Sequence, residues 1–181
     1  MAVVLVVGVT RLRSGSGDPS AVDVGFLQDM IDHHDQAVQM ALIELSNGSS
    51  SVPRNFAGDV IASQRYEIGL MDARLQDWNV TRGAPTRDVM TWMGMRVAHQ
   101  DMPGLASRAS IDALGRAMGS DADALFFRLM IEHHKGGIHM ADYAAAHAHD
   151  GRVRDLAKRM SQTQSLEIGE MQAAQAQLGL S

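Results

Sequence analysis

The amino-acid sequence predicts an all-α protein, specifically a four-helix bundle made of two helical hairpins. Aromatic residues make up only 4% of the 181 residues, whereas there are 13 methionines. A chain poor in aromatic and β-branched residues but rich in Ala, Leu, Met and Gln favours helix over sheet. Four long segments also carry apolar residues at helical spacing, and one segment recurs 100 residues later. A chain of this length suits one domain with a single sizeable core.

The internal repeat is the strongest organising feature of the chain. The stretch Phe26–Ala41 returns as Phe126–Ala141. The residues that are identical in both copies are Phe26, Met30, Ile31, His33, His34, Met40 and Ala41. A second block returns at the same offset, with Gln64, Glu67, Ile68, Gly69, Met71 and Ala73 matched by Gln164, Glu167, Ile168, Gly169, Met171 and Ala173. The pattern indicates one helical unit that occurs twice.

The first hairpin is expected over residues 21–80. Apolar residues from Val22 to Leu45 recur at helical spacing, and Asn47-Gly48 supplies a stop signal. The turn that follows combines a capping serine with an early proline, and a second apolar stripe then continues to Trp78. Because the connection is short, the two helices should pack antiparallel.

The second hairpin is expected over residues 120–179, with a turn at Asp150-Gly151 between its two helices. The crossover between the hairpins, residues 81–119, is not repeated and is divided by prolines and glycines. We expect short helices near 87–98 and 110–118. A crossover of this length lets the second hairpin pack against the first, so residues 21–181 should form one duplicated four-helix domain.

Residues 1–20 are predicted to lie outside that domain. The stretch Met1–Val9 is apolar but too short to span a bilayer, and Arg11 and Arg13 follow it. This pattern is typical of the end of a secretory signal or membrane anchor, followed by a Gly/Ser linker. A buried strand is the alternative, but a helical chain offers it no partner strand. The expected location is therefore extracytoplasmic, either secreted or held at the cell envelope by an N-terminal anchor.

Composition and charge exclude several classes of site. The absence of cysteine excludes disulfides, thiolate metal sites and thiol nucleophiles, so any soft metal would have to be held by Met and His. The formal net charge of −5 argues against nucleic acid as a partner, because phosphate contacts require clustered Lys and Arg. Between Arg13 and Arg54 the charged residues are all acidic, and we expect Asp32 and Asp35 there to form a solvated face.

Helical periodicity directs polar side chains toward the core. On a helical wheel His34 falls at the centre of the apolar stripe, whereas His33 falls on its flank with Met40. Glu67 lies in the middle of the stripe of the next helix, and a buried carboxylate without a partner is costly. The corresponding residues of the second hairpin are His134 and Glu167.

Two interpretations of these residues stay open. In the structural one, each histidine pairs with a glutamate across the bundle and fixes the register of the helices. In the functional one, imidazole, thioether and carboxylate groups converge on a metal ion, and we favour it because both copies keep all three donor types.

The donor types favour copper, especially Cu(I), over zinc or iron. Carboxylate-bridged di-iron bundles require Glu-x-x-His on two helices, and this sequence lacks that pattern. Buried methionines are more often packing residues than ligands. Met40 and Met140, beside the flanking histidines, and the methionines between Met90 and Met102 are the better candidates.

Together these residues resemble the DUF305 family of mostly exported bacterial proteins. The family pattern Phe-x-x-x-Met-Ile-x-His-His-x-x-Ala-x-x-Met-Ala, followed by Gln-x-x-Glu-Ile-x-x-Met, occurs twice between Val24 and Met171, with Gly137 in place of one Ala. The resemblance implies a ferritin-like helical bundle outside the cytoplasm, copper binding in some members and no agreed enzymatic activity. It points to candidate metal-site residues in each copy. They are His33, His34, Met40, Glu67 and Met71, and His133, His134, Met140, Glu167 and Met171.

These observations predict an extracytoplasmic metal-binding protein that binds copper through Met and His, for buffering or tolerance. One alternative is a metal-free envelope or interaction module whose buried His–Glu pairs are structural. A second is a ferritin-like metalloenzyme, which the missing Glu-x-x-His disfavours. The sequence shows no catalytic triad or phosphate-binding glycine loop, so no enzymatic activity is predicted.

Overall fold

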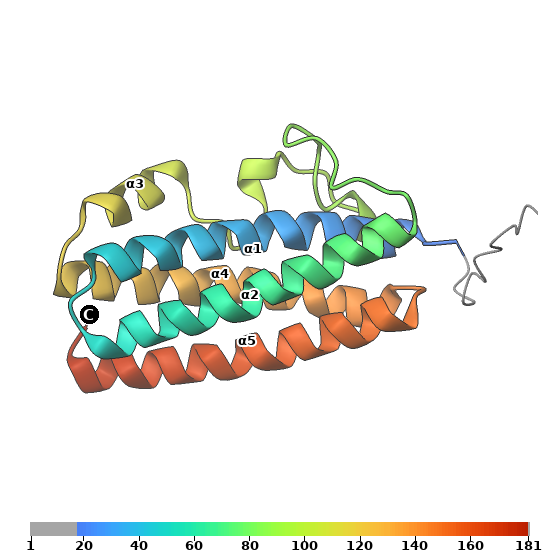
Figure 1. The fold of residues 1–181 in the computed structure, drawn as a ribbon. Coiled ribbons are helices and arrows are strands. Elements are labelled where there is room, and N and C mark those ends of the chain that lie inside the picture. The colour runs from blue at the N-terminus through green and yellow to red at the C-terminus, as the bar shows by residue number, and fades with distance from the viewer. Residues whose placement is uncertain (1–17, 181) are drawn as a thin grey trace, which may run out of the picture.

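Four long helices form a bundle in the computed structural model, which describes residues 18–180 (Figure 1). They are α1 (Ala21–Asn47), α2 (Ser51–Asp77), α4 (Ser120–His147) and α5 (Gly151–Leu178). The all-α prediction is therefore confirmed. The predicted signal or anchor segment lies outside the described residues. Among residues 18–180, no helix is both long and apolar enough to cross a membrane.

Each hairpin packs closely within itself, and the two hairpins meet mainly through α1 and α4. The amide of Gly119, just before α4, donates to the carbonyl of Asn47 at the end of α1 (2.8 Å). At the other end, the amide of Asp150 in the α4–α5 turn donates to Asp23 in the first turn of α1 (2.9 Å). The helices α1 and α4 therefore run antiparallel along the centre of the molecule.

Two buried aspartates tie each hairpin turn to the opposite hairpin. Asp123, in the first turn of α4, accepts hydrogen bonds from the amides of Ser49 and Ser50 in the α1–α2 turn, both at 3.0 Å. Asp23 occupies the matching position of α1 and holds Asp150, which is the counterpart of Ser50. The contacts are thus reciprocal and relate the hairpins by a pseudo-twofold axis. The expected serine cap was a wrong prediction, because the Ser50 side chain makes no capping hydrogen bond. The carboxylate of Asp123 instead accepts from the free backbone amides of the turn.

The crossover contains two short 3-10 turns, η1 (Thr91–Met93) and η2 (His99–Asp101), followed by α3 (Arg108–Arg116). The helix expected near 110–118 begins at Arg108, because the side chain of Ser107 caps it by accepting from the amide of Ser110 (3.1 Å).

The helix expected near 87–98 was a wrong prediction. This stretch instead forms an isolated antiparallel bridge between Val89 and Val97. The backbone amide of Met90 donates to the buried carboxylate of Asp29 (2.8 Å), and Met90 adopts a left-handed φ of 63°. A tertiary hydrogen bond therefore overrides the local helical pattern here.

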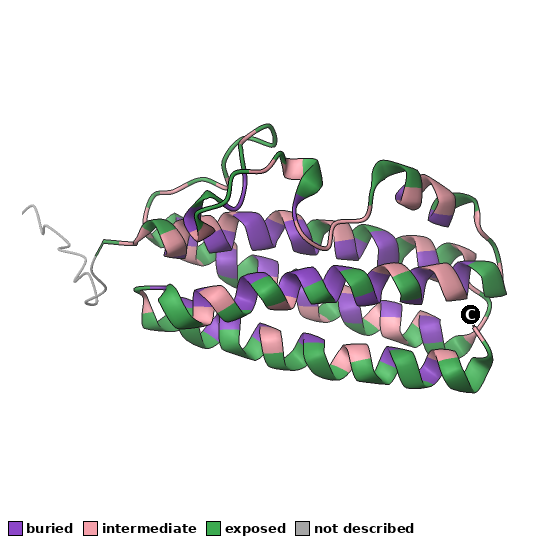
Figure 2. Cartoon of the chain, turned by 180° about the vertical axis from the view of Figure 1, so that it is seen from behind, coloured by how far each residue is buried: buried purple, intermediate pink, exposed green. Residues whose placement is uncertain are grey.

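The core consists of two apolar clusters along the inward faces of the long helices (Figure 2). Along α1, Met30 belongs to one cluster and Met40 to the other; along α4, Met140 belongs to the first and Met130 to the second. The buried histidines lie between these methionines in both helices. A polar layer therefore separates the two halves of the core. It consists of His33, His34, His133, His134, Gln64 and Gln164.

Candidate metal centre

His33 and His133 meet where α1 crosses α4. Their ring centroids are 3.7 Å apart, and the ring planes are inclined by 33°. Both residues are fully buried, as are His34 and His134. The prediction that His33 lies at the edge of the core was therefore wrong. The reason is that α1 packs against α2 on one side and α4 on another, so its buried surface is wider than a single stripe.

The expected His–Glu pairing is confirmed in both hairpins. The Nε2 atom of His34 lies 2.8 Å from a carboxylate oxygen of Glu67, and the corresponding distance between His134 and Glu167 is 2.7 Å. The glutamate side chains keep 19% and 17% of their surface exposed, so each carboxylate still reaches solvent. An ionised carboxylate can only accept a hydrogen bond, so the proton of this contact lies on Nε2 of the imidazole. Neither buried Nδ1 has a hydrogen-bond partner among the described residues.

The stacked pair is also poor in hydrogen bonds. His133 donates from Nε2 to the backbone carbonyl of His33 (3.0 Å), which leaves its Nδ1 bare. Within residues 18–180, neither ring nitrogen of His33 has a partner of good geometry. Burial lowers the pKa of both residues well below the usual histidine value, and the neighbouring histidines lower it further. Both rings are therefore neutral at neutral pH, which is the form that binds metal ions.

Two glutamines complete the polar layer, although sequence reasoning did not select them as site residues. The side-chain oxygens of Gln64 and Gln164 are buried and lack partners among the described residues. Gly137 permits the close approach of Gln164, because a Cβ at this position would overlap the Gln164 amide. The signal was present in the sequence, since both glutamines belong to the repeated block.

The candidate methionines are all fully buried, but they are not grouped by hairpin. Met40 and Met171 belong to one apolar cluster, and Met71 and Met140 belong to the other. Each side of the histidine layer therefore combines thioethers from both hairpins. The candidate methionines are thus not divided according to the copy of the motif that they belong to.

The donor set limits how a metal ion could be held. Across residues 18–180, no three side chains of the His, Cys, Asp and Glu types are grouped closely enough to bind an ion. An ion in this layer would therefore need a thioether or amide ligand beside the imidazoles. The buried ring nitrogens without hydrogen-bond partners fit such a site, because a buried acceptor that binds neither a donor nor a metal ion is unfavourable.

The methionines of the crossover, predicted as a group between Met90 and Met102, differ in burial. Met90 and Met102 are buried in one apolar cluster and Met93 packs against it, whereas Met95 is exposed. Met95 is therefore set apart from the other three methionines.

A short piece of the crossover, Met102–Gly104, lies directly over the stacked histidines, and we call it the roof. A Cβ at Gly104, whose φ is 86°, would lie 2.7 Å from the carbonyl oxygen of His133 and 3.0 Å from Nε2 of His33. A Cβ at Gly136 of α4 would overlap the carbonyl of Pro103. Two glycines in contact thus allow the backbone of the crossover to close over the polar layer.

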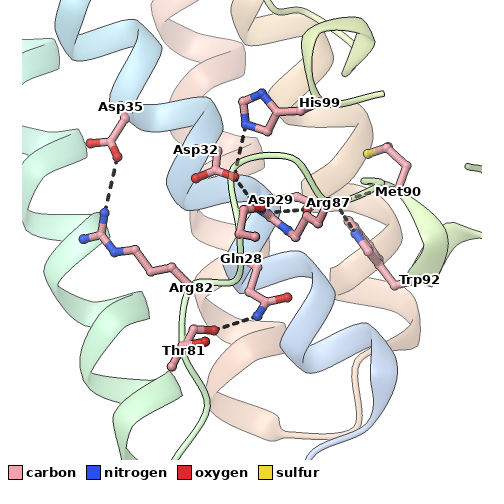
Figure 3. A network of polar contacts seen from close by, with 11 residues as sticks. Gln28, Asp29, Asp32, Asp35, Thr81, Arg82, Arg87, Met90, Trp92 and His99 are labelled. Atoms are coloured by element: carbon pink, nitrogen blue, oxygen red, sulfur yellow. Dashed lines mark hydrogen bonds and ion pairs between the residues drawn. The ribbon is translucent and has the colours of Figure 1, made fainter. Parts of the chain in front are cut away.

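The crossover is attached to α1 through an acidic stripe (Figure 3). Asp29 accepts hydrogen bonds from Arg87, from the amide of Met90 and from the indole of Trp92, each at 2.8 Å.

Asp32 lies one turn further along this stripe. Its carboxylate contacts Arg87 at 2.7 Å and His99 at 3.2 Å. Asp32 is therefore not the solvated residue that the sequence predicted. Asp35 is exposed as predicted, and it pairs with Arg82 at 3.3 Å.

Comparison with known proteins gives a consistent set of relatives. Residues 23–175 match the family described as domain of unknown function DUF305. A DUF305 protein from Streptomyces coelicolor, described as a candidate secreted protein, is 34% identical, with 88% of this chain and 95% of that chain covered and a TM-score of 0.82. A DUF305 fragment from Deinococcus radiodurans is 29% identical, with 89% and 99% covered and a TM-score of 0.78.

A third similar structure is CopM, solved in a Cu(I)-bound form. It is 26% identical, with 86% of this chain and 96% of that chain covered and a TM-score of 0.64. The same protein in a Cu(II)-bound form is 28% identical, with 86% and 97% covered and a TM-score of 0.67. No curated protein matches this chain.

Proposed function

The chain belongs to the DUF305 family, and from this premise we propose that it is an extracytoplasmic protein that binds copper as Cu(I). The observation that carries the proposal is the buried histidine layer, in which neutral imidazoles present bare nitrogens between two groups of thioethers. Thioether is a soft donor that favours Cu(I) over Zn(II), and imidazole is a borderline donor that binds copper as well. The structural similarity to a protein solved with Cu(I) and Cu(II) supports the same direction.

Each group of candidate residues has a distinct role in this proposal. His33 and His133, at the pseudo-twofold axis, are the central nitrogen ligands. Glu67 and Glu167 fix the tautomers of His34 and His134, as carboxylates commonly do for metal-bound imidazoles. The thioether ligands are drawn from the fully buried methionines beside the layer. These are Met40, Met71, Met140 and Met171.

We place this protein outside the cytoplasm and assign it to copper buffering or tolerance rather than to catalysis. The similarity to a Streptomyces protein described as a candidate secreted protein supports the location. A layer buried on all sides suits storage of an ion, since a metal catalyst keeps an open coordination position for its substrate.

Anaerobic competition with a Cu(I) chelator tests the proposal. We expect His33→Ala with His133→Ala to weaken Cu(I) binding by at least about tenfold, because two nitrogen ligands are lost. Met40→Leu with Met140→Leu should weaken Cu(I) binding while leaving Zn(II) affinity unchanged, since the exchange keeps the core volume.

Met30→Leu with Met130→Leu is the matched control, because these methionines are buried in the same two helices. It should leave Cu(I) affinity unchanged. If the native protein binds Cu(I) no more tightly than the His33→Ala, His133→Ala variant, the copper proposal is wrong.

The second candidate function is a metal-free envelope or interaction module. It is favoured by the short His34–Glu67 and His134–Glu167 contacts, which already give each of these histidines one partner. In that case the polar layer fixes the register of the helices, and none of the histidine variants should alter metal affinity.

A further inference from the structure

We infer that the roof, Met102–Gly104, is a gate over the histidine layer that opens while the rest of the crossover stays attached to α1. The purpose of the gate rests on the proposed metal binding, but its movement does not. The inference follows from the uneven way in which the crossover is held.

The first part of the crossover is firmly fixed. Asp29 is almost fully buried, and its carboxylate holds Arg87, Met90 and Trp92 (Figure 3). Trp92 is itself buried and packs edge-on against Phe26 of α1, with ring centroids 5.8 Å apart. Breaking this attachment would strand several buried polar groups, which is costly.

The polar contacts of the part that carries the roof are weaker, and Met102 stays packed in the apolar core while Pro103 and Gly104 move. Before the roof, His99 contacts Asp32 at 3.2 Å, and the His99 side chain is 33% exposed. After it, Ala106 exchanges two hydrogen bonds with the side chain of Gln36, at 2.7 and 3.0 Å. We call these two contacts the latch. Contacts near solvent are worth less than buried ones, so the latch should release well before the Asp29 attachment.

The backbone provides a pivot within the roof. Gly104 has a positive φ of 86°. Glycine changes between such conformations at little steric cost, so the backbone can turn at this residue without strain.

The second hairpin has no equivalent latch among the described residues. The counterpart of Gln36 is Gly136, and the counterpart of Asp32 is Glu132, which forms an exposed pair with Lys135. The gate therefore belongs to α1, and it lies against Nε2 of His33. The polar contact of the His33 ring is with the backbone of Pro103 in the roof and is not of good hydrogen-bond geometry, so lifting the roof gives up only this one weak contact. His33 is thus the first ligand that an incoming Cu(I) ion would meet.

Native-state hydrogen exchange of the metal-free protein tests the movement directly. The amides of Leu105 and Ala106 should exchange faster than the amide of Met90, which Asp29 holds. If these amides are as protected as Met90, the roof opens only with global unfolding and the inference is wrong.

A chemical probe tests access to the histidine. Asp32→Ala removes the carboxylate that contacts both His99 and Arg87, so diethyl pyrocarbonate should modify His33 at least about tenfold faster, as expected for the loss of a charge-assisted hydrogen bond. The matched control is Glu132→Ala, which should leave the rate unchanged. The modified site is identified by mass spectrometry after proteolysis, which separates His33 from the exposed histidines. Equal rates in the two variants would overturn the inference.

Gln36→Ala gives a second release of the latch should Asp32→Ala fail to fold, and it should likewise speed modification of His33. Stopped-flow mixing with Cu(I) then links the gate to the proposed function. Both latch variants should bind and release Cu(I) about tenfold faster with little change in affinity, because the gate is not a ligand. A protein that binds no Cu(I) would refute the proposed function, whereas hydrogen exchange and His33 modification would still decide whether the gate exists.

Discussion

On α1, the surface beneath the crossover carries Asp29 and Gln36, whereas the matching positions of α4 hold Leu129 and Gly136. At the interface between the hairpins the two helices instead keep the same residues, and His33 lies against His133. The difference follows from what each surface touches. Residues near the pseudo-twofold axis face their own counterparts, so a change in one copy disturbs the other. The crossover contacts mainly one hairpin, so the outer surfaces are free to differ.

The largest expected effect is the loss of the Asp29 attachment. Asp29→Ala should lower the free energy of unfolding by about 3–5 kcal/mol, because it leaves a buried amide and an indole N–H without their acceptor and removes one of the two carboxylates that hold Arg87. Urea denaturation measures the change. Leu129→Ala in the second hairpin should cost only about 1–2 kcal/mol, since Leu129 is half-buried and holds no polar group. Equal losses would show that the crossover does not depend on Asp29.

His33 and His133 lie at the pseudo-twofold axis, so the two residues should make similar contributions to the pH dependence of stability. Burial lowers the pKa of both His33 and His133 below 6.5 in the folded protein. Below that pH the two histidines therefore bind protons in the unfolded chain but stay neutral in the folded protein. The contribution of these two histidines to the free energy of unfolding is therefore fully present above about pH 6.5. It falls as the solution is acidified, by up to about 2.7 kcal/mol per pH unit for two histidines. Denaturation of the metal-free protein between pH 5 and 7.5 measures this slope.

Single variants sharpen the comparison. His33→Gln and His133→Gln should each remove about half of the acid slope, because the two rings occupy equivalent places. A large difference between them would mean that the roof, which lies against His33, protects one ring more than the other.

Periodicity and repetition were sufficient to predict the four helices and the contact of His34 with Glu67. Both depend on residues within one hairpin, where helical spacing determines which side chains face each other. The burial of His33 was not predictable in this way, because it depends on a second helix that lies a hundred residues away in sequence. The roof was equally hidden, since the contact between Gly104 and Gly136 is a tertiary approach with no periodic signal.

The His–Glu pairs provide a test that should come out equal in the two hairpins. His34→Ala and His134→Ala should each reduce stability by about 1–3 kcal/mol, because each leaves a cavity and a glutamate without its partner. The value should lie toward the lower end, as both carboxylates still reach water. Thermal unfolding measures both variants. A difference of more than about 1 kcal/mol would show that the pairs are not equivalent, and unchanged Cu(I) affinity in both would favour the structural role.

The last comparison concerns a buried carboxylate that only the first hairpin carries. Glu44 is buried beside Asp123, whereas its counterpart in the second hairpin is Ala144. The pKa of Glu44 is raised to about 8, mainly by burial and in addition by the neighbouring carboxylate of Asp123. Asp123 already accepts bonds from Ser49 and Ser50, so the shared proton must reside on Glu44.

The pH dependence of this pair has the opposite sign to that of the histidines. Between about pH 4.5 and 8 the folded protein keeps a proton on Glu44 that the unfolded chain has lost, so stability falls as the pH rises through this range. Glu44→Gln supplies a permanent N–H donor to Asp123, so its advantage in stability over the native protein should grow as the pH rises from 4.5 to 8. Below pH 4.5 the two proteins should be equally stable. Because the native Glu44 offsets part of the histidine slope, the acid slope between pH 5 and 6.5 should become steeper in Glu44→Gln. If denaturation gives the same slope with and without this substitution, the proton does not reside on Glu44 and the two ends of the bundle are electrostatically alike.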